Sequence, residues 1–170
     1  QGQKVQLAKP LLEAFASSSR VTVTLWRRMG SDRIVIVSSA ACPTDVRIDM
    51  TEGQRLPILM GASGRLFASQ LSLESEEVRA MFEKIRWGMP LSFDEYCAQV
   101  TEASNRGWAV DDGYFSIGIL AVAAPVYSSS GTIDFTVSAV MFRGQKNDKE
   151  IAELGESLCN LARELENVLF

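Results

Sequence analysis

Residues 117–142, IGILAVAAPVYSSSGTIDFTVSAVMF, contain two long apolar runs and decide the fold. The first run is Ile117–Tyr127, the second is Ile133–Phe142, and the polar segment Ser128-Ser129-Ser130-Gly131 joins them. Apolar runs that are rich in β-branched residues and separated by a few turn-forming residues are typical of a β-hairpin. We therefore expect two neighbouring antiparallel strands in this stretch.

A second hairpin is predicted nearer the N-terminus. Every second residue of 21–26 is aliphatic, which is typical of a half-buried strand. Gly30-Ser31-Asp32 provides turn residues, and Arg33–Ser39 returns as another apolar run. A third strand is expected at Val46–Met50, followed by a loop over Thr51–Leu59.

Capping signals mark the ends of two helices. Ser92 followed by Glu95 forms a capping box, and Gly107 fits the position just past the C-terminus of the same helix. Asn147, with Glu150 three residues later, marks the start of the last helix. The sequence therefore predicts both ends of the first of these helices and the start of the second.

The first helix is expected to begin near Lys9, because Pro10 is best tolerated in a first helical turn. Residues 1–8 are then the tail of a preceding element. The remaining predicted elements are helices at Gly61–Gln70 and Glu74–Trp87, and a short strand at Trp108–Val110 that leads into the turn Asp111-Asp112-Gly113.

The predicted order is helix, three strands, three helices, three strands, helix. Consecutive strands joined by hairpins favour an antiparallel sheet, so the fold class is α+β, with six antiparallel strands and helices on the faces of the sheet. The three middle helices fall between the two sets of strands and can wall off one face. This arrangement is a common way to enclose a ligand cavity.

Composition excludes several functional classes. The chain has no histidine, which removes Ser-His-Asp and Cys-His catalysis and the commonest metal ligand, so we expect no enzyme and no metal site. The net charge is −4, and the nearest basic cluster, Trp26-Arg27-Arg28, is too small for a DNA-binding stripe. Gly61-Ala62-Ser63-Gly64 lacks the spacing of a phosphate-binding loop, and no cofactor is expected.

The three cysteines, Cys42, Cys97 and Cys159, form no CxxC pair, so neither a disulfide framework nor a zinc site is predicted. We interpret Cys97 and Cys159 as small buried hydrophobic residues on helices. An alternative is a stand-alone redox enzyme that uses Cys42 or Cys97 as nucleophile, which would need a thiolate of lowered pKa. The longest strongly apolar stretch is shorter than the roughly 20 residues that span a bilayer. With no signal peptide visible, we expect a cytoplasmic protein.

Four stretches, in this order and spacing, resemble the effector-binding domain of the IclR (isocitrate-lyase-regulator) family of bacterial transcription regulators. The stretches are Arg55-Leu56-Pro57, Ala62-Ser63-Gly64-Arg65, Arg106-Gly107-Trp108-Ala109-Val110-Asp111-Asp112 and Val122-Ala123-Ala124-Pro125-Val126-Tyr127. The resemblance runs from about Leu7 to Leu169. It implies a GAF-like domain that binds a small metabolite, often a carboxylic acid, and relays its occupancy to a winged helix-turn-helix domain.

The resemblance also implies a domain organisation. Residues 1–8 would end an interdomain linker helix, residues 9–170 would form the effector-binding domain, and the DNA-binding domain would precede Gln1. DNA would be bound only through that other domain, and no membrane partner is expected. Family members commonly form dimers or tetramers. A third reading is an oligomerisation module with a filled core and no ligand.

By motif position, the resemblance implies a set of effector-binding residues. Ala62 and Ser63 begin a short helix whose free N–H groups suit a carboxylate, although Ser63 could simply cap the helix. Asp111 and Ser138 would be polar anchors, with a turn-forming aspartate and a core hydroxyl as the respective alternatives. The apolar wall would comprise Ile119, Ala121 and Val140, with Ile48 and Leu56 at the closed end.

The sequence departs from the family pattern in ways that remove polarity. Gly113-Tyr114 stands where the family often has two glutamates, and Val140 replaces a frequent serine. Leu120-Ala121 lies where several relatives carry arginine or cysteine. These changes predict an effector more apolar than glyoxylate or pyruvate, such as an aromatic or branched carboxylic acid.

Overall fold

The structure, a computed structural model, describes residues 2–44 and 48–170. Six antiparallel strands form one sheet in the order β3-β2-β1-β6-β5-β4. The strands are β1 (Thr22–Met29), β2 (Arg33–Ala40), β3 (Arg55–Pro57), β4 (Ala109–Asp112), β5 (Ile119–Tyr127) and β6 (Ile133–Phe142). The helices are α1 (Gly2–Ser19), α2 (Gly61–Ala68), α3 (Glu76–Glu83), α4 (Phe93–Arg106) and α5 (Asp148–Leu169). The predicted α+β fold, with six antiparallel strands and helices on the faces, is confirmed.

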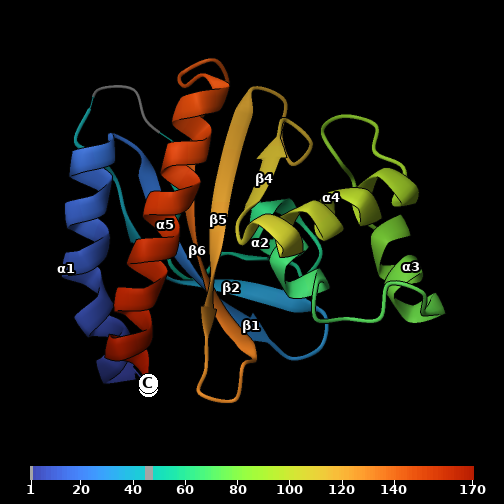
Figure 1. The fold of residues 1–170 in the computed structure, drawn as a ribbon, viewed down its shortest axis with the longest axis horizontal. Coiled ribbons are helices and arrows are strands. Elements are labelled where there is room, and N and C mark those ends of the chain that lie inside the picture. Colours follow the sequence, from blue (N-terminus) through green and yellow to red (C-terminus); the bar gives the residue numbers. More distant parts are fainter. Residues whose placement is uncertain (1, 45–47) are drawn as a thin grey trace.

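The helices form two layers, one on each face of the sheet (Figure 1). The long helices α1 and α5 pack together on one face, where Leu12, Leu158 and Val122 belong to a single buried apolar cluster. The shorter helices α2 and α4, with α3 outside them, lie on the other face around Phe67, Tyr96 and other buried residues. The middle helices therefore wall off one face of the sheet, as predicted.

The hairpin predicted from residues 117–142 forms the centre of the sheet. β5 and β6 pair antiparallel, with Ala123 opposite Ser138 and Ala121 opposite Val140. Along β5, Leu120 and Val122 face α1 and α5, while Ala121 belongs to the opposite face. On that face, Ala121 and Ala123 have small side chains, which leave room between the sheet and α2.

Both predicted ends of α4 and the predicted start of α5 are confirmed. Both halves of the capping box between Ser92 and Glu95 are present, and Gly107 ends α4 in the left-handed conformation at φ 93°. Asn147 and Glu150 form an equivalent box at the start of α5. At α3, Ser75 accepts a hydrogen bond from Val78 N and fixes a later start than the predicted Glu74.

The predicted start of the first helix near Lys9 is wrong. α1 runs without a break from Gly2 to Ser19, with Pro10 inside it. Ala8, Leu12 and Ala16 are fully buried, so the apolar stripe that faces the sheet and α5 crosses the proline. The free energy gained by packing this stripe against the sheet and α5 is larger than the cost of the helical hydrogen bond that Pro10 cannot donate.

The third strand also differs from the prediction. It lies at Arg55–Pro57, inside the stretch that was expected to be a loop, where Leu56 pairs with Ile34 at the edge of the sheet. Residues 48–50 form no strand, and 46 and 47 lie outside the described residues. A proline is acceptable on an edge strand because no further strand needs its N–H. The strand predicted at Trp108–Val110 is observed at Ala109–Asp112, so Asp111 and Asp112, which were predicted to lie in the following turn, belong to the strand.

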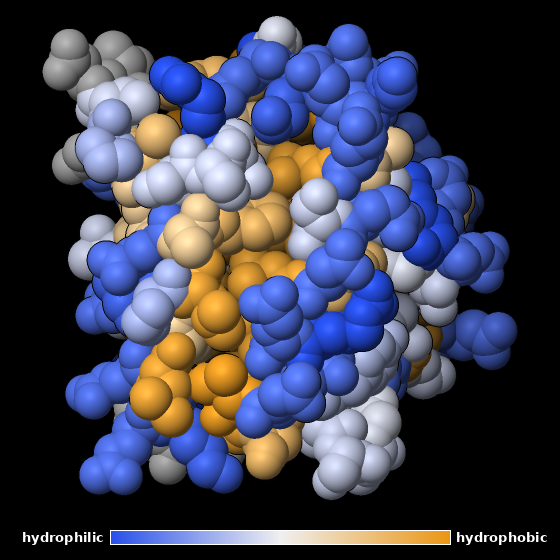
Figure 2. All heavy atoms as spheres, turned by 60° about the vertical axis from the view of Figure 1, so that its left-hand side comes forward, coloured by the Kyte–Doolittle hydropathy of each residue, from blue (hydrophilic) through white to orange (hydrophobic). Residues whose placement is uncertain are grey.

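Apolar side chains reach the surface on the side of the molecule that carries α1 and α5 (Figure 2). Leu7 in α1 is 62% exposed and Phe170, directly after α5, is 42% exposed.

No helix among the described residues is long and apolar enough to cross a membrane.

Candidate functional site

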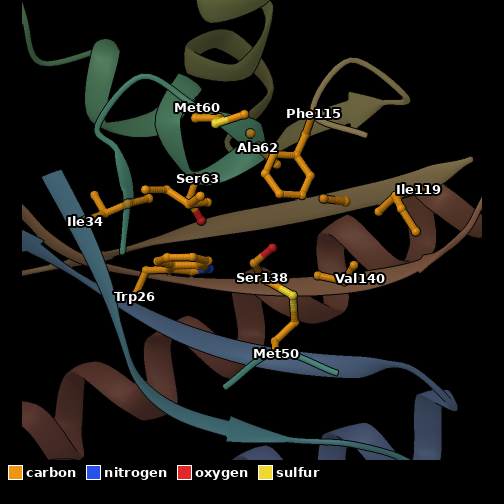
Figure 3. Close-up of a pocket in the computed structure, with 13 residues that line it drawn as sticks. Trp26, Ile34, Met50, Met60, Ala62, Ser63, Phe115, Ile119, Ser138 and Val140 are labelled. Atoms are coloured by element: carbon orange, nitrogen blue, oxygen red, sulfur yellow. The ribbon is translucent and has the colours of Figure 1, made fainter. Parts of the chain in front are cut away.

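A cavity lies between the sheet and the N-terminal end of α2 (Figure 3). Trp26, Ser138 and Val140 rise from the sheet, Ala62 and Ser63 come from α2, and Phe115 and Ile119 stand at one end in Figure 3. None of the described residues that line the cavity is charged; the lining is completed by Ile34, Met50, Leu56, Met60, Gly61 and Ala121.

The cavity is narrow. The cavity itself measures about 30 Å³, and the hollow around it measures about 380 Å³ with the open mouth included. A volume of this size holds water, whereas small-molecule sites typically measure about 300–1,000 Å³. Met50 and Met60, which have flexible side chains, fill part of the hollow. A ligand of several carbon atoms therefore needs these side chains to move.

Hydroxyl groups supply the polarity of the cavity. Thr136 Oγ1 donates a 2.7 Å hydrogen bond to Ser63 Oγ, so the Ser63 proton remains available. In Figure 3 the Ser63 and Ser138 hydroxyls point toward the same space. Opposite Ser138 in β1 lies Thr24, whose buried hydroxyl has no hydrogen-bond partner within the described chain. Of these groups, the Ser63 and Ser138 hydroxyls line the cavity and can hydrogen-bond the polar end of a ligand.

The N-terminus of α2 adds backbone donors. Met60 is the N-cap residue and provides no side-chain hydrogen bond, and the first intrahelical bond runs from Gly64 N to Met60 O. The N–H groups of the first helical turn consequently lack helical partners, and they lie at the positive end of the helix dipole. Gly64 is required here, because a Cβ at this position would come 2.2 Å from the carbonyl carbon of Leu59.

The structure brings most of the residues expected from the resemblance to this cavity. Seven of the nine line it: Leu56, Ala62, Ser63, Ile119, Ala121, Ser138 and Val140. Sequence reasoning missed Trp26, Ile34, Met50, Met60, Gly61 and Phe115. Strand alternation places Trp26 on the face opposite to Val23 and Leu25, which is the face that carries the cavity, and this signal could have identified it.

Asp111 does not line this cavity, contrary to the expectation that it anchors the ligand. Its Oδ2 pairs with Arg65 Nη1 at 2.7 Å, and its Oδ1 accepts hydrogen bonds from Tyr114 N and Phe115 N. The carboxylate therefore holds the chain that follows β4, which agrees with the alternative of a turn-forming aspartate. Its ion-pair partner Arg65 is fully buried.

Ile48 also lies outside the cavity. It lines a neighbouring hollow with Thr22, on the other side of Val140. Its carbonyl accepts a 2.7 Å hydrogen bond from Thr22 Oγ1, so its role in the structure is to attach the segment before β3 to β1.

The cysteines lie away from the cavity and are half-buried, so the prediction that Cys97 and Cys159 are buried holds only in part. Burial is the main cause that raises the pKa of the Cys97 thiol, and Asp94 adds to it. The pKa of Cys159 is likewise raised by burial and by Glu156. Raised pKa values oppose the formation of the thiolate that a redox nucleophile needs. Among the described residues, no group of acidic and cysteine side chains could hold a metal ion.

Comparison with known proteins identifies the family. Residues 4–167 match the family model described as bacterial transcriptional regulator IclR C-terminal. The chain belongs to the IclR family. In this family the matched region forms the effector-binding domain, and the relatives are transcription regulators.

Three relatives illustrate the similarity. The acetate operon repressor of Salmonella typhimurium is 25% identical over 170 residues, which are 94% of this chain and 60% of that protein. The IclR regulator of Alicyclobacillus acidocaldarius superimposes with a TM-score of 0.84 at 26% identity, covering 99% of this chain and 67% of that one. The inducer-binding domain of Acinetobacter PobR, solved as a double mutant with 3-hydroxybenzoic acid, gives 0.79 at 19% identity, covering 96% and 97%. This IclR-family domain thus corresponds to part of the longer regulators.

Proposed function

We propose that this domain senses a small carboxylic acid with an apolar or aromatic body, and that occupancy controls DNA binding by another domain of the same protein. The observation that carries the proposal is the cavity at the start of α2, which has an uncharged apolar wall and a cluster of hydroxyl and N–H donors. The carboxylate would bind at Ser63, Ser138 and the first N–H groups of α2. Asp111 and Ile48 are not part of this proposed set.

The apolar lining favours an aromatic or branched acid over a small dicarboxylate. Trp26 and Phe115 offer aromatic surfaces, and Val140 contributes no polar atom. PobR, which shares the fold, is described with 3-hydroxybenzoic acid in its inducer-binding domain. The mechanism would be allosteric, with a typical coupling free energy of about 1–3 kcal/mol between effector and DNA.

Thermal unfolding against a panel of aliphatic and aromatic carboxylic acids tests the proposal. A ligand at 100 times its Kd stabilises the folded state by about 2.7 kcal/mol. For a domain of this size, each kcal/mol raises Tm by roughly 2–4 °C. We expect an aromatic or branched acid to raise Tm, and a panel without any shift would contradict the sensor function.

An oligomerisation module without a ligand is the second candidate, favoured by the small cavity and by the exposed Leu7 and Phe170. It predicts no change in Tm with any acid but a Tm that rises with protein concentration. Sedimentation of the domain at several concentrations, with and without the acids, separates the two candidates.

A further inference from the structure

Arg65 is a fully buried charged residue that joins two helices and a strand. Its Nη1 donates hydrogen bonds to Gly61 O at 2.8 Å and to Asp111 Oδ2 at 2.7 Å. Its Nε donates to Gln99 Oε1 at 2.9 Å. One side chain therefore connects the first turn of α2, the end of β4 and the middle of α4.

Aromatic rings surround the same guanidinium group. Its central carbon lies 5.6 Å from the ring centroid of Trp87, 5.4 Å from that of Tyr96 and 5.9 Å from that of Tyr114. Arginine is attracted to ring faces at these distances. The Arg65 Nη2 atom is buried without a hydrogen-bond partner in the described chain, so the rings are its surroundings. The side chain has little freedom to leave this position.

Asp111 extends the connection to the opposite wall of the cavity. Its Oδ1 accepts from Tyr114 N at 3.0 Å and from Phe115 N at 2.9 Å. Phe115 lines the cavity from that side, and Gly61 lines it from the side of α2. A continuous path of hydrogen bonds thus runs from one wall through Arg65 and Asp111 to the other.

We propose that Arg65 and Asp111 are positioning residues, which fix the Phe115 wall relative to the start of α2 without contacting the effector. The inference rests on the proposed function of the cavity. A buried ion pair adds little stability compared with apolar residues of the same size, but removal of one partner leaves an uncompensated charge. Its effect here is on the shape of the cavity. When an effector enters, the wall that carries Phe115 stays in place, and the side chains of Met50 and Met60 move to widen the cavity.

Amide exchange measured by NMR on the whole chain without a ligand tests the positioning role. In Asp111→Ala, which removes the acceptor oxygen, we expect the Tyr114 and Phe115 amides to exchange at least tenfold faster, relative to amides of β6, than in the parent. Asp112→Ala is the matched control, because Asp112 is adjacent and pairs with Arg143 at 2.7 Å on the surface. It should leave both rates within twofold. Unchanged rates in Asp111→Ala would overturn the inference.

A double-mutant cycle on effector affinity distinguishes positioning from direct contact. With the best acid of the thermal panel, Arg65→Met and Asp111→Asn should each weaken binding at least tenfold, and the double variant should be no weaker than either single variant. If Asp111 acted only by touching the effector itself, Asp111→Asn would weaken binding and Arg65→Met would not. Arg65→Gln replaces Arg65→Met if the latter does not fold, with the same expectation, because glutamine also removes the charge that faces Asp111. If the parent binds no acid, the proposed function fails, but the exchange measurement still decides the positioning role.

Discussion

The hydroxyl of Thr136 donates a 2.7 Å hydrogen bond to the hydroxyl oxygen of Ser63. Both residues are buried, and the bond joins β6 to the first turn of α2. Because Ser63 accepts this bond, its own proton can be donated to a ligand in the cavity. The bond therefore sets both the position of α2 above the sheet and the polarity of the site.

Ser63→Ala should weaken binding of the effector by about tenfold to a hundredfold. A hydrogen bond to a charged group contributes about 1.5–3 kcal/mol, and Thr136 also loses its acceptor. Isothermal titration with the acid found by thermal unfolding measures the effect. Ser69→Ala is the control, since its hydroxyl bonds to Leu66 O at the far end of α2. Equal affinities of the Ser63→Ala variant and the parent would show that the carboxylate binds elsewhere.

Val140→Ser should shift effector preference toward smaller and more polar acids. Val140 lines the cavity beside Ser138, and a serine there would leave a hydroxyl unpaired against an apolar ligand. The ratio of affinities for an aromatic acid and for pyruvate should fall by about tenfold, on the basis of about 1–3 kcal/mol for an unpaired buried polar group. Because both affinities are measured on the same variant, their ratio does not change with a general loss of stability. If both acids weaken equally, Val140 does not determine specificity.

Features with local signals were predictable from the sequence. The β5–β6 hairpin followed from its apolar runs, and the ends of α4 and α5 followed from their capping residues. Such signals depend on residues a few positions apart, so tertiary context rarely changes them. The prediction of where α1 starts was wrong, because it relied on the local preference of Pro10 for the first turn of a helix. Burial of Leu12 against other elements outweighs that preference.

The candidate site was predictable only where strand alternation or a motif placed a residue on the right face. Ser138 and Val140 meet this condition. The ion pair of Asp111 could not be predicted in this way, because its partner Arg65 lies 46 residues earlier and no periodicity links the two residues. An arginine within a helix of otherwise small and apolar residues was the available sign that Arg65 is buried with a partner. The narrowness of the cavity depends on side-chain packing, which sequence alone does not specify.

Gly155→Ala should destabilise the domain by up to about 2 kcal/mol, the difference between an overpacking cost of about 1–3 kcal/mol and the gain in helix propensity. A Cβ on Gly155 would come 2.4 Å from Cδ2 of Trp108, so α5 would have to move away from the sheet. This cost exceeds the helix propensity gained on replacing glycine, which is about 1 kcal/mol. Urea unfolding measures the change, and Ser157→Ala on the exposed side of α5 is the control. A stabilised Gly155→Ala variant would mean that α5 packs less closely than described.

Cys97 should react slowly with iodoacetamide at neutral pH. Burial and the neighbouring Asp94 raise the pKa of the thiol, so the thiolate fraction is smaller than that of an ordinary cysteine at every pH below this pKa. The alkylation rate, followed by mass spectrometry across pH, should level off at a higher pH in the folded chain than in the urea-unfolded chain. Cys97→Ser should leave effector affinity unchanged, because this residue is not part of the cavity. A rate that levels off below pH 8 in the folded chain would instead indicate an activated thiol and favour the redox-enzyme alternative.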